Sequence, residues 1–220
     1  MSLLRILIAD DSEFLRTAFK RIFDTEDGFE VVAIASDGGE ALAMAIELSP
    51  DVAILDLRMP IMDGISVAHS ITNDDSETGV VILTHYDDLA FVSALMKDGA
   101  TGKAYILKHS LNDISEIVRV VKAVSKGWAA LDGTIVQNLL AIYRRLTASR
   151  STAATDMEER ILGLMLEGYD KYDIAQTLEL PLEPVEALSA SLCGKLGLSE
   201  EEGQSRSPQL VQAIVTRCVP

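Results

Sequence analysis

The chain has 220 residues, of which 48% are hydrophobic and 24% are charged. This composition is typical of a globular protein with room for two small domains. The formal net charge of −15 argues against broad affinity for nucleic acids, although it leaves room for a local basic patch. No apolar run approaches the roughly 18 residues of a membrane span. The start MSLLRILIADD turns acidic too soon for a signal peptide, so we expect a cytoplasmic protein.

The residue types that most often bind transition metals are scattered. His69, His85 and His109 lack ligand spacing, which favours surface or partly buried histidines over a zinc site. Cys193 and Cys218 lack such spacing too, and we expect them to be reduced thiols.

Residues 1–126 alternate between two hydrophobic periods. Runs rich in Val, Ile and Leu predict strands buried on both faces, namely LRILIAD, FEVVAIA, DVAILDL, GVVILTH and KAYILK. Amphipathic stretches predict helices over 12–24, 38–48, 63–72, 87–98 and 111–126. Ser12 and Asp63 are suitable residues for helix starts. The alternation predicts an α/β fold, a doubly wound five-stranded parallel sheet with helices on both faces.

The strand pattern stops after Gly127. Helices are predicted over 132–146, 156–167, 171–178, 183–196 and 208–217, with an acidic loop, SEEEGQSRS, before the last one. Small polar residues make 147–156 the best candidate for a flexible linker. We therefore divide the chain into an α/β domain (1–126), a linker helix with a flexible linker (127–153) and a small all-α domain (154–220).

Polar side chains follow four of the predicted strands. Asp10 and Asp11 close the first strand and Asp56 the third, whereas Thr84 and Lys108 close the fourth and fifth. The carboxyl ends of parallel strands meet at one edge of a sheet, so we expect these side chains to lie together. Three neighbouring carboxylates repel one another, and Mg²⁺ suits such a site because it takes one or two carboxylates, waters and a phosphate oxygen. A metal-neutralised carboxylate beside a lysine can attack a phosphoryl group and hold the acyl phosphate.

Each of these residues has an ordinary structural alternative when it is considered alone. Asp11 could cap a helix, Lys108 could be a surface lysine with a buried stem, and Thr84 could be a hydrogen-bonded hydroxyl at a strand end. Their occurrence together at four strand ends favours the functional interpretation.

The motifs ILIADDS, DVAILDLRMPIMDG, VVILTHYDD and YILK resemble the receiver domain of bacterial two-component response regulators, which has a flavodoxin-like fold. The resemblance covers residues 1 to about 125 and implies that Asp56 is the phospho-acceptor. It also implies a sensor histidine kinase or a small phosphodonor as the source of the phosphoryl group. Mg²⁺ would be held by Asp10, Asp11, Asp56 and the backbone carbonyl of Arg58. The chain would then be a phospho-accepting regulator and not an enzyme.

The same resemblance assigns roles to three further residues. Thr84 would hydrogen-bond the phosphoryl group, Lys108 would pair with it, and Tyr105 would change rotamer on activation. An ordinary edge-strand aromatic is the alternative for Tyr105. Two features depart from the family pattern, because extra residues precede Lys108 in GATGKAYILK and His109 replaces a common proline. We therefore expect a remodelled loop before the fifth strand.

A phosphatase of the haloacid dehalogenase type is the main enzymatic alternative. Such enzymes also use a strand-end aspartate with Mg²⁺, but they need a second aspartate two residues further on as general acid. That position is Arg58 in this chain, which disfavours the alternative.

WAALDGTIVQNLL and the segment from DMEERILGLMLEGYDKYDIAQTLEL to PLEPVEALSASLCGKLGL resemble the linker and the LuxR-type helix-turn-helix of NarL/FixJ response regulators. Gly168 would be the turn glycine, and Asp170 could cap the next helix. The matching framework residues are Glu158, Ile161, Leu162, Leu164, Gly168, Ile174, Ala175, Leu178, Val185, Leu192, Lys195, Leu196 and Gly197.

The expected DNA-contacting surface departs from that family. Pro181 replaces the usual Ser or Thr, Glu186 the usual Lys and Leu188 the usual His. Residues 155–203 hold 12 acidic and 3 basic residues, a net charge of −9, which opposes phosphate contacts. The predicted recognition helix comprises Glu183, Pro184, Val185, Glu186, Ala187, Ser189, Ala190 and Lys195.

Three interpretations of the helical tail follow. The protein could be a phosphorylation-switched transcription factor with an atypical DNA contact, or its tail could bind protein through Leu182, Leu188 and the acidic face. The tail could also serve as a scaffold for a homodimer. An apolar patch around Leu188 would favour protein binding. A basic surface would favour DNA, and the residues available for it are Arg144, Arg145, Arg150 and Lys171. In the resting state we expect the receiver to contact the tail and to mask part of it.

Overall fold

The computed structural model describes residues 3–73, 77–111, 113–147, 155–198 and 207–219. Its strands form one parallel sheet in the order β2-β1-β3-β4-β5-β6. The strands are β1 (Leu4–Ala9), β2 (Phe29–Ala35), β3 (Val52–Asp56), β4 (Gly79–Thr84), β5 (Lys103–Leu107) and β6 (Ala130–Leu131). The α/β prediction is thus confirmed, with one strand more than expected. The sequence pattern did not indicate β6 because two residues are too few to form a periodic run.

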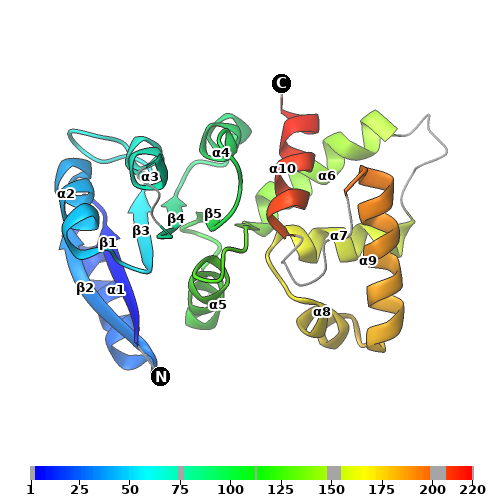
Figure 1. Ribbon diagram of the computed structural model, residues 1–220, viewed down its shortest axis with the longest axis horizontal. Helices are drawn as coiled ribbons and strands as arrows, with labels where there is room; N and C mark the ends of the chain where they lie inside the picture. Colours follow the sequence, from blue (N-terminus) through cyan, green and yellow to red (C-terminus); the bar gives the residue numbers. More distant parts are fainter. Residues whose placement is uncertain (1–2, 74–76, 112, 148–154, 199–206, 220) are drawn as a thin grey trace.

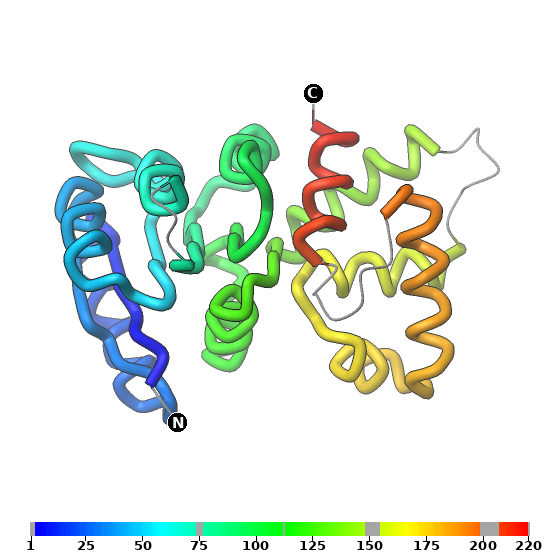
Figure 2. Tube along the Cα trace, in the orientation of Figure 1, coloured from blue at the N-terminus to red at the C-terminus, as the bar shows by residue number. Residues whose placement is uncertain are grey.

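The helices occur where the hydrophobic periods predict them (Figures 1 and 2). They are α1 (Glu13–Thr25), α2 (Gly38–Leu48), α3 (Gly64–Asn73), α4 (Leu89–Met96), α5 (Ile114–Val124), α6 (Gly133–Thr147), α7 (Asp156–Leu166), α8 (Lys171–Leu178), α9 (Leu182–Leu196) and α10 (Ser207–Cys218). Most of the predicted linker (148–154) and of the predicted acidic loop (199–206) lies outside the described residues. The proposed domain boundaries remain a prediction.

Local hydrogen bonds explain where several helices begin. Ser12 accepts from the backbone N of Leu15 and caps α1, and Asp63 accepts from Ser66 N in the first turn of α3. Asp170 caps α8, and Thr155 forms a reciprocal capping box with the helical residue Glu158.

Two hydrophobic cores flank the sheet. One core lies beneath α1 and α5 and includes Phe19, Phe23 and Val121. The other begins beneath α2, α3 and α4, and it continues without interruption through β6 into α6, α7, α9 and α10. The α/β part of the chain and the helical tail therefore share buried apolar surface, which contributes to holding them together.

The last helix, α10, lies between the two parts of the chain (Figure 1). It packs against α4 on one side and against α6, α7 and α9 on the other. Ser207 at its start donates from Oγ to the carbonyl of Ala129 at 2.5 Å and accepts from Ala129 N at 2.8 Å. The face of α4 is consequently covered by the tail in this arrangement, in agreement with the expected contact between receiver and tail.

Candidate functional site

The strand ends bring Asp10, Asp56 and Lys108 together as predicted. Lys108 Nζ lies 2.7 Å from Asp10 Oδ2 and 2.6 Å from Asp56 Oδ1. All three side chains are less than 10% exposed, so one buried ammonium group joins two buried carboxylates. Such charge-assisted hydrogen bonds are stronger in a poorly hydrated site than in water.

Backbone N–H groups hold the other oxygen of each carboxylate. Asp10 Oδ1 accepts from Ser12 N at 2.9 Å, and Asp56 Oδ2 accepts from Arg58 N at 2.8 Å. Gly64 shapes the loop that follows β3, because a Cβ atom there would overlap the carbonyl of Asp56. The orientation of the Asp56 carboxylate is therefore set by its own strand and loop.

Burial and neighbouring charges shift the pKa values of Asp56 and Lys108. Burial, reinforced by the Asp10 charge, raises the pKa of Asp56 even though Lys108 and Arg58 N act in the opposite direction. Burial alone would lower the pKa of Lys108, but its hydrogen bonds to both carboxylates raise it above the ordinary lysine value. The lysine therefore stays protonated and acts as the counter-ion of the site.

Thr84 ends β4, the strand next to β3, and Tyr105 lies on β5, the strand that follows it in the sheet. The Thr84 hydroxyl accepts from Tyr86 N at 3.2 Å and also hydrogen-bonds the Tyr105 side chain. The Tyr105 hydroxyl donates to the carbonyl of Tyr86 at 2.8 Å, and burial raises the pKa of this phenol. Tyr105 is fully buried and does not lie on an edge strand, because β6 covers the free side of β5.

Asp11 lies exposed at the rim, apart from the bridged pair. Among the described residues, no group of three or more His, Cys, Asp or Glu side chains converges as a metal site would require. The donor chemistry nevertheless fits Mg²⁺, since three carboxylates with one ammonium group leave an excess of negative charge on hard oxygen atoms. The Lys108 ammonium group contacts both Asp10 and Asp56, two of the residues that would hold the cation.

The Arg58 side chain contributes a contact that the sequence analysis did not predict. Its guanidinium carbon lies 5.4 Å from the centre of the Tyr86 ring and 5.3 Å from that of Phe91. These cation–π contacts connect the loop after β3 to the start of α4. Residue spacing gave no signal for them because the partners lie on separate elements: Arg58 follows β3, Tyr86 follows β4 and Phe91 lies in α4.

The predicted recognition helix, α9, presents an acidic surface. Glu183 and Glu186 are exposed with Pro184 and Ala187, whereas Val185 and Ser189 are buried in the core. Pro184 lies in the first turn, where no intrahelical N–H bond is lost.

The lysines near α9 are engaged with carboxylates. Lys195 Nζ lies 2.8 Å from each carboxylate oxygen of Glu158, and Lys171 Nζ lies 2.6 Å from Glu186 Oε1. These contacts compete with binding to DNA phosphates.

Two surface features were expected to distinguish the outputs: an apolar patch around Leu188 and a basic surface. Leu188 is half-buried against the core, so it does not form an exposed apolar patch. Arg144 Nε donates to Glu159 at 2.6 Å, Lys171 is paired as described, and Arg150 lies outside the described residues. Two of the four basic residues are thus paired with carboxylates, whereas Arg145 is exposed.

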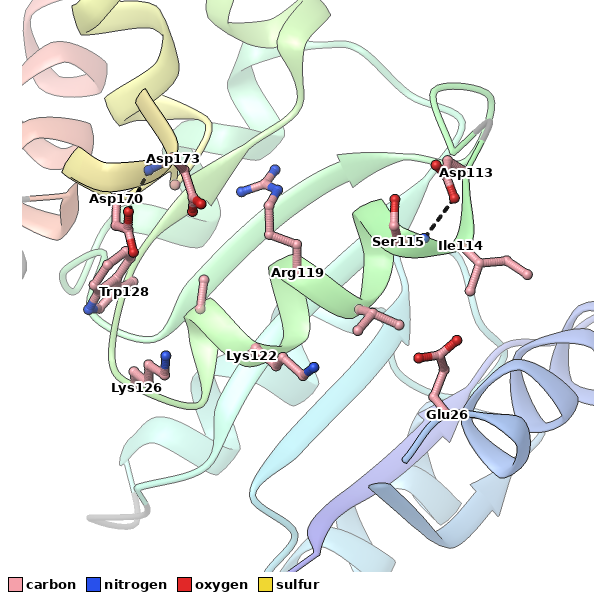
Figure 3. Close-up of a pocket in the computed structure, with 13 residues that line it drawn as sticks. Glu26, Asp113, Ile114, Ser115, Arg119, Lys122, Lys126, Trp128, Asp170 and Asp173 are labelled. Carbon is pink, nitrogen blue, oxygen red and sulfur yellow. Dashed lines mark hydrogen bonds between the residues drawn. The ribbon is translucent and has the colours of Figure 1, made fainter. Parts of the chain in front are cut away.

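A second set of contacts joins α5 of the receiver to the end of α7. The Arg119 guanidinium carbon lies 3.9 Å from the centre of the Tyr169 ring, and Nη1 donates to the Glu167 carbonyl at 3.0 Å. Figure 3 shows the adjoining groove, into which Lys122 and Trp128 also project. The sequence gave no indication of this junction, because its members are about 50 residues apart and carry no motif.

Comparison with known proteins identifies the class. Residues 6–122 match the response regulator receiver domain family. The oxygen regulatory protein NreC of Staphylococcus haemolyticus is 33% identical over 217 residues, 95% of each chain. The chain therefore belongs to the two-component response regulators, a family that accepts phosphoryl groups and typically uses Mg²⁺ to do so.

Solved structures refine this assignment. A LuxR-family two-component response regulator from Aurantimonas is 31% identical, with a TM-score of 0.56 over 62% of this chain and 94% of that one. The RcsB response regulator of Salmonella typhimurium has the same overall fold, with a TM-score of 0.56 over the whole of both chains at 21% identity. Within the response regulators, the chain is of the NarL/LuxR type.

In the described part of the chain, no helix combines the length and the hydropathy that a membrane crossing requires.

Proposed function

We propose that Asp56 accepts a phosphoryl group from a sensor histidine kinase or a small phosphodonor, and that this event switches the helical tail. The observation that carries the proposal is the buried bridge from Lys108 to Asp10 and Asp56 at the carboxyl edge of the sheet. Asp56 would attack phosphorus through a carboxylate oxygen and form an acyl phosphate, while the donor leaves with the bonding electrons.

The other residues have separate roles in this proposal. Mg²⁺, held by Asp10, Asp11, Asp56 and the Arg58 carbonyl, would supply charge neutralisation when bound. Lys108 would turn from the carboxylates to the new phosphoryl oxygens. The Thr84 hydroxyl, already oriented by Tyr86 N, would donate its proton to the same group.

For the output, the proposed function is regulation of transcription through the helix-turn-helix of α7, α8 and α9. The framework of that motif supports this proposal, with Asp170 as the cap of α8 and Gly168 in the turn at φ 81°. A second candidate is an output that binds protein or another copy of the chain and no DNA. The exposed Glu183 and Glu186 and the paired Lys171 and Lys195 favour this candidate.

The phospho-acceptor is tested by labelling the full chain with acetyl phosphate. We expect Mg²⁺-dependent incorporation that is lost in Asp56→Asn and retained in Asp63→Asn, a matched change at the nearby aspartate that hydrogen-bonds Ser66. Full incorporation into the Asp56→Asn chain would refute the site.

Fluorescence anisotropy distinguishes an output that binds DNA from one that does not. The phosphorylated chain is titrated with mixed duplex DNA between about 20 and 200 mM salt. Binding through phosphates weakens steeply with salt. Glu183→Lys and Glu186→Lys should each strengthen binding at low salt if α9 faces DNA. If the unmodified chain, Glu183→Lys and Glu186→Lys all fail to bind DNA, the result favours an output that binds protein or another copy of the chain.

A further inference from the structure

Asp132 is a buried carboxylate at the point where the receiver sheet passes into helix α6. Its side chain is 1% exposed, and both carboxylate oxygens accept backbone N–H groups. Oδ1 accepts from Thr134 N at 2.8 Å, in the first turn of α6. Oδ2 accepts from Leu107 N at 3.2 Å, at the end of β5. One side chain therefore joins the last residue of β5 to the start of α6.

The bond to Leu107 continues the ladder beyond the end of β6. That strand is two residues long, and its last pair with β5 is Tyr105 with Leu131. The Tyr105 carbonyl then accepts from Asp132 N at 2.8 Å, and the Asp132 side chain reaches Leu107 N two residues further along. A buried N–H group without an acceptor is costly. The carboxylate therefore replaces the carbonyl that a longer strand would have supplied.

Leu107 is the direct neighbour of the counter-ion lysine. Lys108 N donates to the Thr84 carbonyl at 2.7 Å, and Lys108 Nζ binds Asp10 and Asp56. The peptide bond from Leu107 to Lys108 therefore lies between the donor held by Asp132 and the lysine that binds both carboxylates, so a backbone shift at Lys108 would displace Leu107 N as well.

Helix α6 carries the connection into the tail. It packs against α7 and α10, and its residues Ile135, Val136 and Leu139 are fully buried in the core shared by the receiver and the tail. Because close-packed cores transmit displacement, a shift of the first turn of α6 changes the support of both helices.

We propose that Asp132 is the positioning residue that couples the state of Asp56 to helix α6 and so to the helical tail. The proposal rests on the proposed function, phosphorylation of Asp56. When Lys108 leaves the carboxylates for the phosphoryl group, the end of β5 moves, and Asp132 moves the start of α6 with it. The element with two arrangements is thus the β5–Asp132–α6 connection.

The substitution Asp132→Ser in the full chain should keep the bond from Thr134 N and remove the bond from Leu107 N. Serine is a good N-cap for α6, but its side chain is too short to reach Leu107 N. Trp128, the only tryptophan, lies at the junction four residues before Asp132 and reports on it by fluorescence (Figure 3). With acetyl phosphate and Mg²⁺, we expect normal labelling of Asp56 in Asp132→Ser. We also expect a Trp128 response about fivefold smaller than in the unmodified chain.

The matched control is Asp113→Ser. Asp113 caps α5 through a 2.9 Å bond from Ser115 N, as Asp132 caps α6, and we expect this variant to keep the full response. A labelled Asp132→Ser chain with a full Trp128 response would overturn the role of Asp132. An unmodified chain that takes no label would instead overturn the proposed function, and the coupling with it.

The unmodified chain provides a second test that needs no variant to fold. Leu107 and Thr134 supply the two amide protons that Asp132 accepts, so their hydrogen-exchange rates should change together on phosphorylation. A change in the exchange of α10 while both amides stay constant would also overturn the proposal.

Discussion

Lys108 is the residue whose ammonium group contacts both Asp10 and Asp56, two of the residues that would hold Mg²⁺. A bound cation would share these carboxylates with a charge that already pairs with both of them. The repulsion between Asp10 and Asp56 makes the site attractive to a cation, and the lysine weakens that attraction. We therefore expect Lys108 to have two effects: it stabilises the metal-free chain, and its charge opposes a second cation at the same carboxylates.

We predict that Lys108→Met raises the affinity for Mg²⁺ by about tenfold or more, since it removes the competing charge. Without metal, the same change should destabilise the chain by about 3–5 kcal/mol, the cost of breaking a buried ion pair. Calorimetric Mg²⁺ titration and thermal unfolding in chelator measure the two effects.

The control is Lys103→Met, which removes a buried lysine of the same strand that donates to the Leu95 carbonyl. This variant should bind Mg²⁺ as the unmodified chain does. An unchanged or weaker affinity in Lys108→Met would contradict the competition.

Glu158 predicts a pH dependence of stability. Its hydrogen bond from Lys195, together with that from Thr155 N, holds the pKa of this buried carboxyl at about 2, against an ordinary value of 4.5. The unfolded chain therefore binds the proton more readily than the folded chain. The stabilisation is fully present above about pH 4.5 and is lost as the pH falls towards 2.

We expect Lys195→Met to lower the free energy of unfolding by about 1–2 kcal/mol at pH 6, a value reduced for the partial exposure of the lysine. Urea unfolding of the full chain at several pH values should show this difference shrinking between pH 4.5 and 2. A difference that stays constant over that range would show that the Lys195–Glu158 ion pair is not the source of the pH dependence of stability.

At the scale of elements, the turn between α7 and α8 presses against β6. Gly168 has a φ of 81°, and a Cβ atom there would lie 2.8 Å from Ala130 Cβ and 3.1 Å from the Ala129 carbonyl. Gly197 has a similar φ of 72° but nothing within 4 Å of the same position. A Cβ atom at Gly168 would therefore cause both backbone strain and overlap with β6, whereas one at Gly197 would cause backbone strain alone.

Gly168→Ala should cost about 2–4 kcal/mol of unfolding free energy, because backbone strain and overpacking add together. Gly197→Ala should cost only about 1 kcal/mol, from strain alone. Urea unfolding of both full-length variants gives the comparison, and equal costs would argue against the packing of the turn on β6.

The elements that could be predicted from sequence are those with a period. The five longer strands and the ten helices have apolar runs or amphipathic faces, and the carboxyl ends of the strands follow from their parallel order. β6 could not be predicted because it has two residues, and the role of Asp132 could not be predicted because its partner Leu107 on β5 lies 25 residues away. Lys195 belongs to the predicted recognition helix, but spacing gave no signal for its ion pair with Glu158, 37 residues earlier in the chain.

At the scale of the whole molecule, the receiver and the tail are joined by β6, α6 and α10. Asp132 connects β5 to α6, Arg119 contacts Tyr169, and Ser207 binds the Ala129 backbone. Because α10 packs on α4, α4 can contact another molecule through that face only after α10 moves. A phosphorylation signal that reaches α4 or α6 therefore acts directly on the packing of the tail.

The most direct test of the account is the hydrogen exchange of the α10 amides, residues 207–218, in the full chain with Mg²⁺. We predict faster exchange when acetyl phosphate is present and Asp56 is labelled, and no change in Asp56→Asn under the same conditions. Identical α10 exchange in the unlabelled and fully labelled chains would contradict a phosphorylation switch that acts through the packing of receiver and tail.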